Sequence, residues 1–486
     1  MAISPIQKLV QSLNQGELKQ FSLKVKKANN TEYNKIFQSI RLGKEPQYTN
    51  KNTFSQRKKY LYDTLIELLN NSTSSIDAII LKKLLSLETL FKRQLNILAF
   101  KEANKAQKLA EKHERYGLLI QIFEWKKSIG YYLEDFTRQD YFDLSEREEH
   151  ILNEQLCYLK AKNKYMEILN LKREFGYLNS DYDRSLFLKF GEINQSTKSK
   201  RTLFYSRMTK AIYHWMLKEH DKEYELTKLN VESVDIEVDN VEFMIAHLEH
   251  LTSCVCNANF TELVSTLNNL KTKNQNGFFG KNMIIDLKLF YYSANYEILS
   301  YAHMGNMEQL RLKVNEVESE ISAWGSNMSK EMLSVIYTAL KMGHYYLGDT
   351  KRSKYYINKM MNNYAGKIRK DVYFDALLFN LIIIFDNLEN IDYLDSNLNS
   401  TIRFLKINNM KNSFEYLFAS SLRKHIHDDR IFEKVYGDLE PKFHKYFYKL
   451  KNGKLYSENY QPIYLWLLSK VKKEPFITIV KNWSSS

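Results

Sequence analysis

Apolar residues recur at helical spacing along most of the chain. From Met332 to Leu347 they form a stripe with a period of three to four residues, which is typical of an α-helix buried on one side. Gly348-Asp349 interrupts this stripe, and a second stripe runs from Ser353 to Tyr364. Two amphipathic segments joined by a tight turn predict a helical hairpin, in which Leu340 faces the partner helix.

The same pattern of stripe, polar turn and stripe repeats along the chain. The turns follow Leu217, Cys256, Met304, Leu347, Leu388 and a segment near His427, at intervals of 39 to 48 residues. Helix–turn–helix units with a period of about 40 residues are typical of an α-solenoid, in which stacked hairpins bury one another's apolar faces. We therefore predict an all-α fold, a right-handed superhelix of stacked hairpins preceded by a helical N-terminal region.

Two of these turns carry a resemblance to a known repeat. Tyr345-Tyr346-Leu347-Gly348-Asp349, followed by Ser353, Tyr356 and Ile357, resembles the hairpin of a tetratricopeptide repeat, and the segment 301–306 is similar. The resemblance covers about residues 200–450 and implies a TPR-like α-solenoid, a fold that often binds proteins or peptides.

Other segments resemble a second group of proteins. Leu9–Phe21 with Lys59–Asp63, and the region from Arg369 to Leu405, are similar to bacterial helical-repeat proteins of comparable length. That group is uncharacterised and has no assigned activity, so the resemblance implies a fold and a bacterial origin but no function.

Breaks in the pattern divide the chain into four parts. We expect an N-terminal helical region at 1–72, a segment of long helices at 73–198, TPR-like hairpin repeats at 199–450, and a C-terminal helix with a frayed tail at 451–486. Ser145 with Glu148 resembles a capping box, which predicts that a helix begins there and runs to about Tyr177.

Hydropathy and cysteine content predict the cellular compartment of the protein. The most apolar run, Tyr373–Phe385, contains Asp375 and Asn380 and is shorter than a membrane-spanning helix, so we expect a buried helix and no membrane partner. The N-terminus lacks the apolar stretch of a secretory signal. Three cysteines do not make a disulfide framework. The sequence predicts a cytoplasmic protein and says nothing about its oligomeric state.

Charge adds a nucleic-acid alternative. The net charge is +14, and residues 1–100 and 401–486 carry most of the excess of basic residues. The acid-free stretches 46–62, 193–218 and 441–457 interleave bases with aromatic residues, as single-stranded nucleic acid binding requires. Amphipathic helices produce the same mixture, and we favour that interpretation. The candidate contacts are Lys198, Lys200, Arg201, Arg207, Lys445, Lys449 and Lys451.

One group of residues has the chemistry of a metal site. His247, His250 and Cys254 lie at i, i+3 and i+7 and share a helical face, with Cys256 close by. Imidazole and thiolate are good zinc ligands, but structural zinc sites usually draw ligands from two elements. The apolar residues beside this face favour packing, so we expect no bound metal and no cofactor.

Two further patterns point to enzymes and carry less weight. Arg207 and His214 fit the RxxxxxxH spacing of helical HEPN ribonucleases, at a frequency that chance alone supplies. His425 and His427, with Asp428 and Asp429, lie at a predicted turn, where capping and solvation explain them better than a metal.

These observations rank three functions. We expect a non-catalytic scaffold or adaptor that binds a protein or peptide on the concave face of a solenoid, because stacked hairpins form an extended groove. Nucleic-acid binding through the basic ends is the alternative. A metal-dependent or HEPN-like enzyme comes third, since the sequence contains neither a GxxxxGK[ST] phosphate loop nor an HExxH or GxSxG motif.

Overall fold

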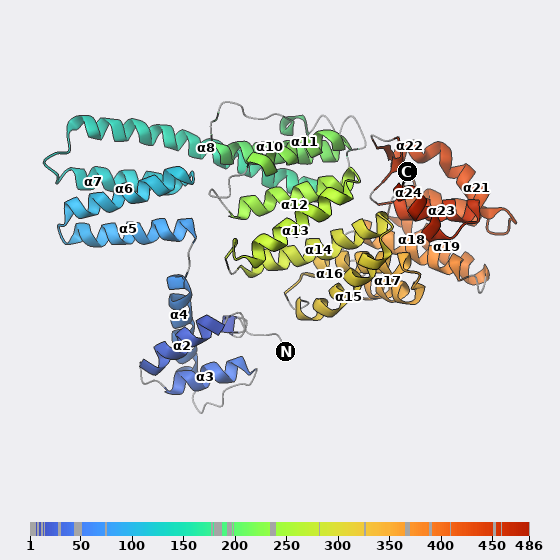
Figure 1. Cartoon of the computed structure of the whole chain (residues 1–486), viewed down its shortest axis with the longest axis horizontal. Helices are drawn as coiled ribbons and strands as arrows, with labels where there is room; N and C mark the ends of the chain where they lie inside the picture. The colour runs from blue at the N-terminus through green and yellow to red at the C-terminus, as the bar shows by residue number, and fades with distance from the viewer. Residues whose placement is uncertain are drawn as a thin grey trace. The chain divides into compact units, whose positions relative to one another are not determined.

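The computed structural model shows a helical protein (Figure 1). It describes residues 6, 9–10, 13, 15–27, 31–42, 51–72, 75–175, 178, 187–191, 197, 199–233, 240–280, 282–324, 327–364, 370–387, 391–408, 410–450, 453–457 and 459–485. About 83% of the described residues lie in helices. The predicted all-α fold is confirmed. The chain forms two compact units, Met1–Gln155 and Leu156–Ser486.

The first unit contains two hydrophobic cores. Its helices are α2 (Gln15–Lys27), α3 (Thr31–Arg41), α4 (Lys51–Ser72), α5 (Ile76–Lys92), α6 (Asn96–Lys112), α7 (Tyr116–Gly130) and the first part of α8 (Arg138–Phe175). Phe21, Phe37 and Leu65 bring α2, α3 and α4 together. The second core includes the helices α5, α6 and α7. Four alanines on α6, from Ala99 to Ala110, are fully buried there, and their small side chains allow the helices on either side to approach closely.

The start of α8 differs from its prediction. The helix begins at Arg138, and Ser145 lies inside it, with its Oγ donating to the Tyr141 carbonyl. Thr137 and Asp140 form the reciprocal cap instead, since the Thr137 N–H donates to Asp140 Oδ2 (2.8 Å) and the Asp140 N–H donates to Thr137 Oγ1 (3.2 Å). The prediction of a helix start at Ser145 is therefore wrong, because a second capping box precedes it by eight residues.

The second unit is built mainly from successive helices. They are α10 (Lys200–Met216), α11 (His220–Ser233), α12 (Asn240–Cys256), α13 (Phe260–Gln275), α14 (Met283–His303), α15 (Met307–Trp324), α16 (Lys330–Tyr346), α17 (Thr350–Tyr364), α18 (Lys370–Asp386), α19 (Ile391–Ile407), α20 (Phe414–Lys424) and α21 (Ile431–Leu439). Each contacts the next one along the chain. Contacts also join α12 to α14, α14 to α16, α16 to α18 and α18 to α20.

Four turns of this unit share one backbone conformation. Lys218, Ala258, Gly305 and Gly348 have φ between 55° and 80°. At each turn the next residue donates its N–H to a carbonyl five residues earlier, as from Asn259 to Cys254 (2.8 Å), which is the Schellman motif. These turns stand where the sequence predicted them, and so does the turn between α20 and α21. The predicted turn at 389–390 lies outside the described residues.

The buried residues agree with the predicted apolar stripes. Leu340 is fully buried in the largest core together with Leu378, Phe379 and 381–385 of α18, while Phe374 and Leu377 of the same run pack in a smaller core with Leu405. Among the described residues, none of the helices is both long and apolar enough to cross a membrane.

The C-terminal segment returns to earlier turns of the unit. It begins with the 3-10 helix η2 (Glu440–Lys442) and the short helix α22 (Phe443–Tyr446). The antiparallel strands β1 (Tyr448–Lys449) and β2 (Leu455–Tyr456) follow, and then the helices α23 (Gln461–Lys472) and α24 (Phe476–Ser485). The Tyr448 hydroxyl donates to the Cys256 carbonyl at the end of α12. The predicted frayed tail is helical to Ser485, because α24 packs on the unit through Ile479 and Val480.

Candidate functional site

A cavity of about 750 Å³ opens where three hairpin turns meet the C-terminal segment. The turns are those between α10 and α11, α12 and α13, and α14 and α15. Strand β1, the loop after it and the end of α24 complete the wall. The lining residues are Lys218, Glu219, His220, Asp221, Lys222, Tyr224, Asn257, Ala258, Asn259, Phe260, Thr261, His303, Met304, Tyr448, Lys449, Leu450, Lys454, Trp483 and Ser484.

Aromatic contacts hold the C-terminal segment against the turns. The ring of Tyr456 stacks on Trp483 with centroids 6.1 Å apart and meets Phe260 edge-on at 6.3 Å. The ring of Tyr448 lies 4.7 Å from that of His220. Aromatic pairs of this kind add to the stability gained from buried area. The wall of the cavity is therefore packed from segments that are far apart in the sequence.

The lining of the cavity carries more positive than negative charge. Four lysines line it, at 218, 222, 449 and 454, against the carboxylates of Glu219 and Asp221. Burial and the nearby Lys445 lower the pKa of Lys218. Lys222 pairs with Glu219 at 3.1 Å, which neutralises one lysine. The balance of the lining favours an anionic ligand.

A buried histidine forms part of the cavity wall. His303 is 1% exposed, and its ring stacks on Phe260 at 5.1 Å. Burial lowers the pKa of His303 to about 3, so the imidazole is neutral at physiological pH. Among the described residues neither ring nitrogen has a hydrogen-bond partner, and the buried hydroxyls of Tyr346 and Tyr456 share this property. Unsatisfied buried polar groups of this kind are rare and mark places where water or a ligand can bind.

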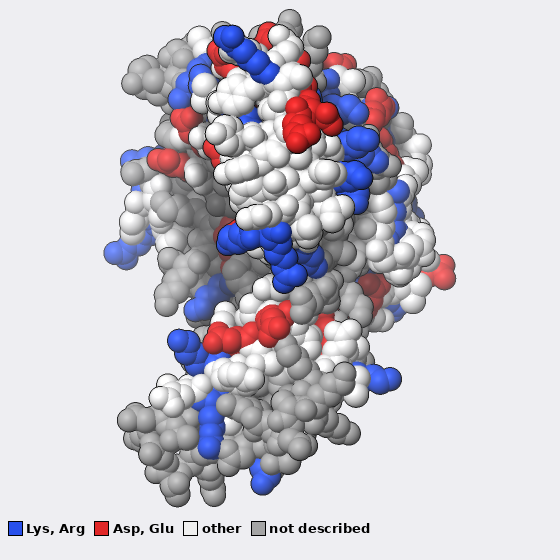
Figure 2. Space-filling model, turned by 90° about the vertical axis from the view of Figure 1, so that its left-hand side faces the viewer, with Lys and Arg blue, Asp and Glu red and all other residues white. Residues whose placement is uncertain are grey.

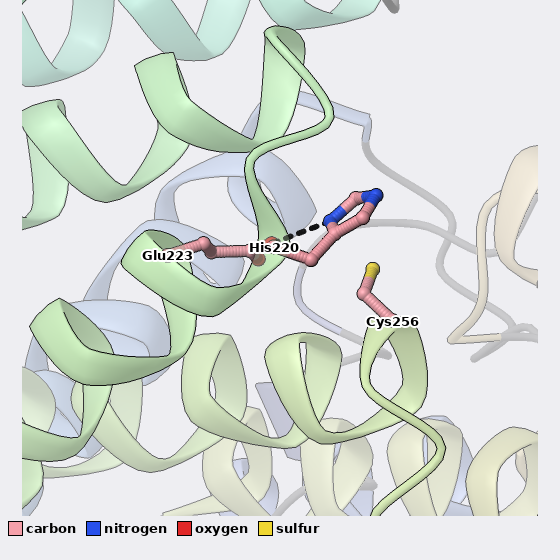
Figure 3. Close-up of side chains that lie close together, drawn as sticks. All are labelled: His220, Glu223 and Cys256. Carbon is pink, nitrogen blue, oxygen red and sulfur yellow. Dashed lines mark hydrogen bonds and ion pairs between the residues drawn. The ribbon is translucent and has the colours of Figure 1, made fainter. Parts of the chain in front are cut away.

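Next to the cavity, three buried residues form a compact cluster (Figure 3). His220 and Glu223 come from the first turn of α11, and the His220 Nδ1 lies 3.1 Å from a Glu223 oxygen. Cys256, at the end of α12, points toward the imidazole. The three potential ligand atoms lie within 4.8 Å of one another. Burial raises the pKa of both Glu223 and Cys256, so the neutral carboxyl and the thiol are favoured.

The predicted metal ligands separate into different places. His250 and Cys254 lie together and are joined by Glu262 from α13, with all three ligand atoms within 4.8 Å. His247 lies apart, its Nδ1 2.9 Å from the Phe243 carbonyl and its ring against Phe243. Cys256 belongs to the cluster with His220. The shared face of three ligands that the sequence predicted is thus replaced by two clusters, each completed by residues of a neighbouring helix.

The candidate nucleic-acid contacts also lie in different surroundings. Arg201 makes a close ion pair with Glu242 (2.7 Å) and lies over the Tyr158 ring, and Arg207 donates to Ser233 Oγ (2.8 Å). Lys200 is exposed at the start of α10. Lys445 and Lys449 are exposed, and Lys449 lines the cavity. Lys198 and Lys451 lie outside the described residues.

The aromatic residues of 193–218 belong mostly to the core. Phe204, Tyr205 and Tyr213 are buried, which agrees with the favoured interpretation of these rings as part of a core face, while 193–196 and 198 lie outside the described residues. The rings cannot stack on bases while α10 is folded.

The two weaker enzyme patterns are engaged in local contacts. His214 Nδ1 lies 2.6 Å from Glu219, while Arg207 bonds to Ser233. His425 contacts Asp428 and Asp438, and His427 and Asp429 are exposed. These contacts fix the turn between α20 and α21.

Sequence reasoning missed most of the cavity. It also missed the two clusters beside the cavity: His220, Glu223, Glu262 and His303 were not singled out, because their partners Cys256, His250 and Phe260 lie on other helices. The one available signal was the recurrence of polar and basic residues at successive hairpin turns.

Comparison of the chain with protein-family models, with curated proteins and with solved structures found no match.

Proposed function

We propose that the protein is a non-catalytic scaffold or adaptor that binds an acidic peptide segment of a protein partner. Its second unit acts as a TPR-like solenoid of stacked hairpins. The contacts between alternate helices, from α12 to α20, support this arrangement, because stacking brings equivalent helices of successive hairpins together. The site that we assign to the peptide is the cavity at the hairpin turns.

The observation that carries the proposal is the cavity itself. Its volume of about 750 Å³ suits a ligand of a few residues. Lys218 from the turn between α10 and α11, and Lys449 and Lys454 from the C-terminal segment, line it and offer charge-assisted bonds to carboxylates. Asn257 and Asn259 can bond to a peptide backbone, and the rings of Tyr448 and Trp483 offer apolar contact area.

The protonation states of the buried groups favour binding over catalysis. A thiol with a raised pKa, such as that of Cys256, is a poor nucleophile. An imidazole with a pKa of about 3, such as that of His303, is a weak general base at neutral pH. Both groups suit a site that forms hydrogen bonds without transferring protons.

Fluorescently labelled hexaglutamate is a direct probe of the proposal, with hexalysine as its charge control. We expect hexaglutamate to bind the full chain at low salt and hexalysine to show no binding. The double variant Lys218→Gln with Lys449→Gln should weaken binding about 100-fold or more, since each of the two charged hydrogen bonds contributes about 1.5 kcal/mol or more. Lys424→Gln with Lys434→Gln, at exposed residues that do not line the cavity, is the matched control. Equal affinities in both double variants would reject the cavity as the site.

Single-stranded nucleic acid is the second candidate, because Lys445 and Lys449 are exposed close to the cavity. Figure 2 shows another face of the molecule, where Lys and Arg stand in separate groups among acidic and uncharged residues. A labelled oligonucleotide distinguishes the candidates. Nucleic-acid binding would require tighter binding of the oligonucleotide than of hexaglutamate, with a log–log salt slope of about −0.7 per neutralised phosphate.

A further inference from the structure

We propose that His250, Cys254 and Glu262 form a zinc-binding site within the hairpin of α12 and α13. His250 and Cys254 lie one turn apart on α12, and Glu262 lies in the first turn of α13. The site is independent of the peptide function proposed above. The sequence argued against zinc because its candidates came from one helix, and Glu262 supplies the missing ligand from a second element.

The distances between the ligand atoms are close to those of a zinc site. His250 Nε2 lies 3.1 Å from Glu262 Oε1 and 3.7 Å from Cys254 Sγ. A tetrahedral zinc ion with its usual bond lengths places nitrogen, oxygen and sulfur ligands about 3.3 to 3.6 Å apart. One imidazole nitrogen thus faces both other ligands at nearly the required spacing. The third pair, Cys254 Sγ and the Glu262 carboxylate, lies within 4.8 Å.

The hydrogen bonds around His250 leave its Nε2 facing both other ligands. Thr227 Oγ1 lies 3.1 Å from His250 Nδ1, and the Thr227 hydroxyl donates to the Tyr224 carbonyl (3.0 Å). In the metal-free protein Nε2 hydrogen-bonds to Glu262 Oε1, and with the ion bound we expect the ring proton on Nδ1, where the Thr227 oxygen can accept it. We expect the ion to take the place of the proton shared by Nε2 and Glu262 Oε1.

The residues that hydrogen-bond to the proposed ligands are arranged as they are around a metal site. The Tyr224 hydroxyl donates to Glu262 Oε2 (2.6 Å), which leaves Oε1 directed at His250. Thr227 is held in turn by Ser253 Oγ at 2.8 Å. Outer hydrogen bonds of this kind orient metal ligands and raise the affinity for the ion.

The choice of metal follows from the donor set and from access. One thiolate, one imidazole and one carboxylate suit Zn²⁺, whereas Mg²⁺ and Ca²⁺ prefer oxygen ligands alone. His250 and Cys254 are buried, while Glu262 is 35% exposed at its side chain. The exposed side admits the ion and leaves the fourth position for water.

Cobalt binding tests the proposal, because a cobalt–thiolate bond absorbs light. The full chain is freed of metal with a chelator and titrated first with Co²⁺ and then with Zn²⁺. We expect one equivalent of Co²⁺ to give a thiolate-to-cobalt charge-transfer band and the strong visible absorption of a tetrahedral ion, and Zn²⁺ to displace it. Cys254→Ser should abolish the charge-transfer band, and His250→Gln should weaken Zn²⁺ binding about 100-fold or more.

The chain offers matched controls at neighbouring positions. Cys256→Ser and His247→Gln should bind Co²⁺ and Zn²⁺ as the wild type does, because both residues lie outside the site. Glu262→Gln, at a half-buried surface position, should fold normally and weaken Zn²⁺ binding about tenfold to 100-fold. Circular dichroism of the metal-free variants separates lost binding from lost folding. A wild-type chain without the charge-transfer band would overturn the proposal, as would a band that disappears in Cys256→Ser and persists in Cys254→Ser.

Discussion

Two clusters of the same residue types lie side by side along α11, α12 and α13, and they differ in chemistry. The zinc cluster, His250 with Cys254 and Glu262, directs one imidazole nitrogen at both other ligands and has an exposed carboxylate. The His220 cluster, with Glu223 and Cys256, is buried at all three residues. Identical residue types are thus poised to bind an ion in one place and to fix a turn in the other.

The difference comes from where the glutamate stands. Glu223 lies three residues after His220 on the same helix, so their contact forms as soon as α11 folds. Glu262 reaches His250 across a hairpin, and its contact exists only when α12 and α13 pack. Burial raises the pKa of Glu223, whereas hydrogen bonds from Tyr224 and His250 outweigh burial and lower the pKa of Glu262. The packing therefore favours the protonated form of the first carboxyl and the charged form of the second.

The largest expected effect separates the clusters by stability. His220→Ala should lower the free energy of unfolding by about 3 kcal/mol, because it leaves the buried Glu223 without its hydrogen-bond partner and opens a void. His250→Ala in metal-free protein should cost less, since Glu262 keeps its bond to Tyr224 and its contact with water. Urea denaturation measures both. Equal losses would mean that the two clusters contribute equally to the free energy of unfolding.

The pH dependence of stability should have opposite signs at the two glutamates. Folded Glu223 holds a proton that the unfolded chain releases, so its stabilisation is complete below the unfolded pKa of 4.5 and declines as pH rises through the higher folded pKa. Folded Glu262 has the lower pKa, so its stabilisation is complete above 4.5 and is lost as pH falls through the folded value. Each unit of difference in pKa corresponds to about 1.4 kcal/mol.

Glutamine variants isolate these two contributions, because glutamine keeps the shape of the side chain and does not titrate. Relative to wild type, Glu223→Gln should gain stability as the pH rises from about 4 to about 8. Glu262→Gln should lose stability relative to wild type as the pH rises from about 3 to about 5, because the wild type gains the Glu262 contribution over this range. Urea midpoints across this range provide the measurement. Parallel curves for the two variants would contradict the assigned directions.

The sequence predicts the hairpins much better than it predicts the clusters. A turn such as Gly348-Asp349 interrupts an apolar stripe, and the interruption is visible in the order of residues alone. Even the turns at Lys218 and Ala258, which lack glycine, were located from the end of the stripe. The cause is that helical periodicity is local, so each hairpin leaves its pattern in about 40 consecutive residues.

The clusters depend on contacts between elements, which the order of residues does not record. Cys254 and Cys256 are two positions apart, so on a helix they point to nearly opposite sides. One therefore faces α13 and the other faces α11, although they look like one group in the sequence. Tyr448 reaches the Cys256 carbonyl from 192 residues away. No spacing rule anticipates a contact of that range.

A smaller effect should distinguish a residue that positions a metal ligand from one that only packs. Thr227→Val removes the hydrogen-bond partner of His250 Nδ1 at 3.1 Å and leaves that nitrogen buried, which should cost about 1 to 2 kcal/mol. It should also weaken Zn²⁺ binding about tenfold or more. Thr252→Val is the control, since Thr252 bonds to Tyr296 (2.8 Å) instead. A stability loss without a change in Zn²⁺ affinity would show that Thr227 is purely structural.

The smallest expected effect tests the charge around the zinc cluster. Lys228 is exposed on α11, and its positive charge lowers the pKa values of both His250 and Glu262. Lys228→Gln should change the free energy of unfolding by no more than about 0.5 kcal/mol. The same change should raise Zn²⁺ affinity a few-fold at low salt, because it removes a cation that repels the ion, and the gain should fade at about 1 M salt, where the Debye length falls to about 3 Å. Lys222→Gln, which breaks the pair with Glu219 on the same helix, should leave Zn²⁺ affinity unchanged. A gain of equal size in both variants would mean that the ion responds to the net charge of α11 rather than to the cluster in the hairpin of α12 and α13.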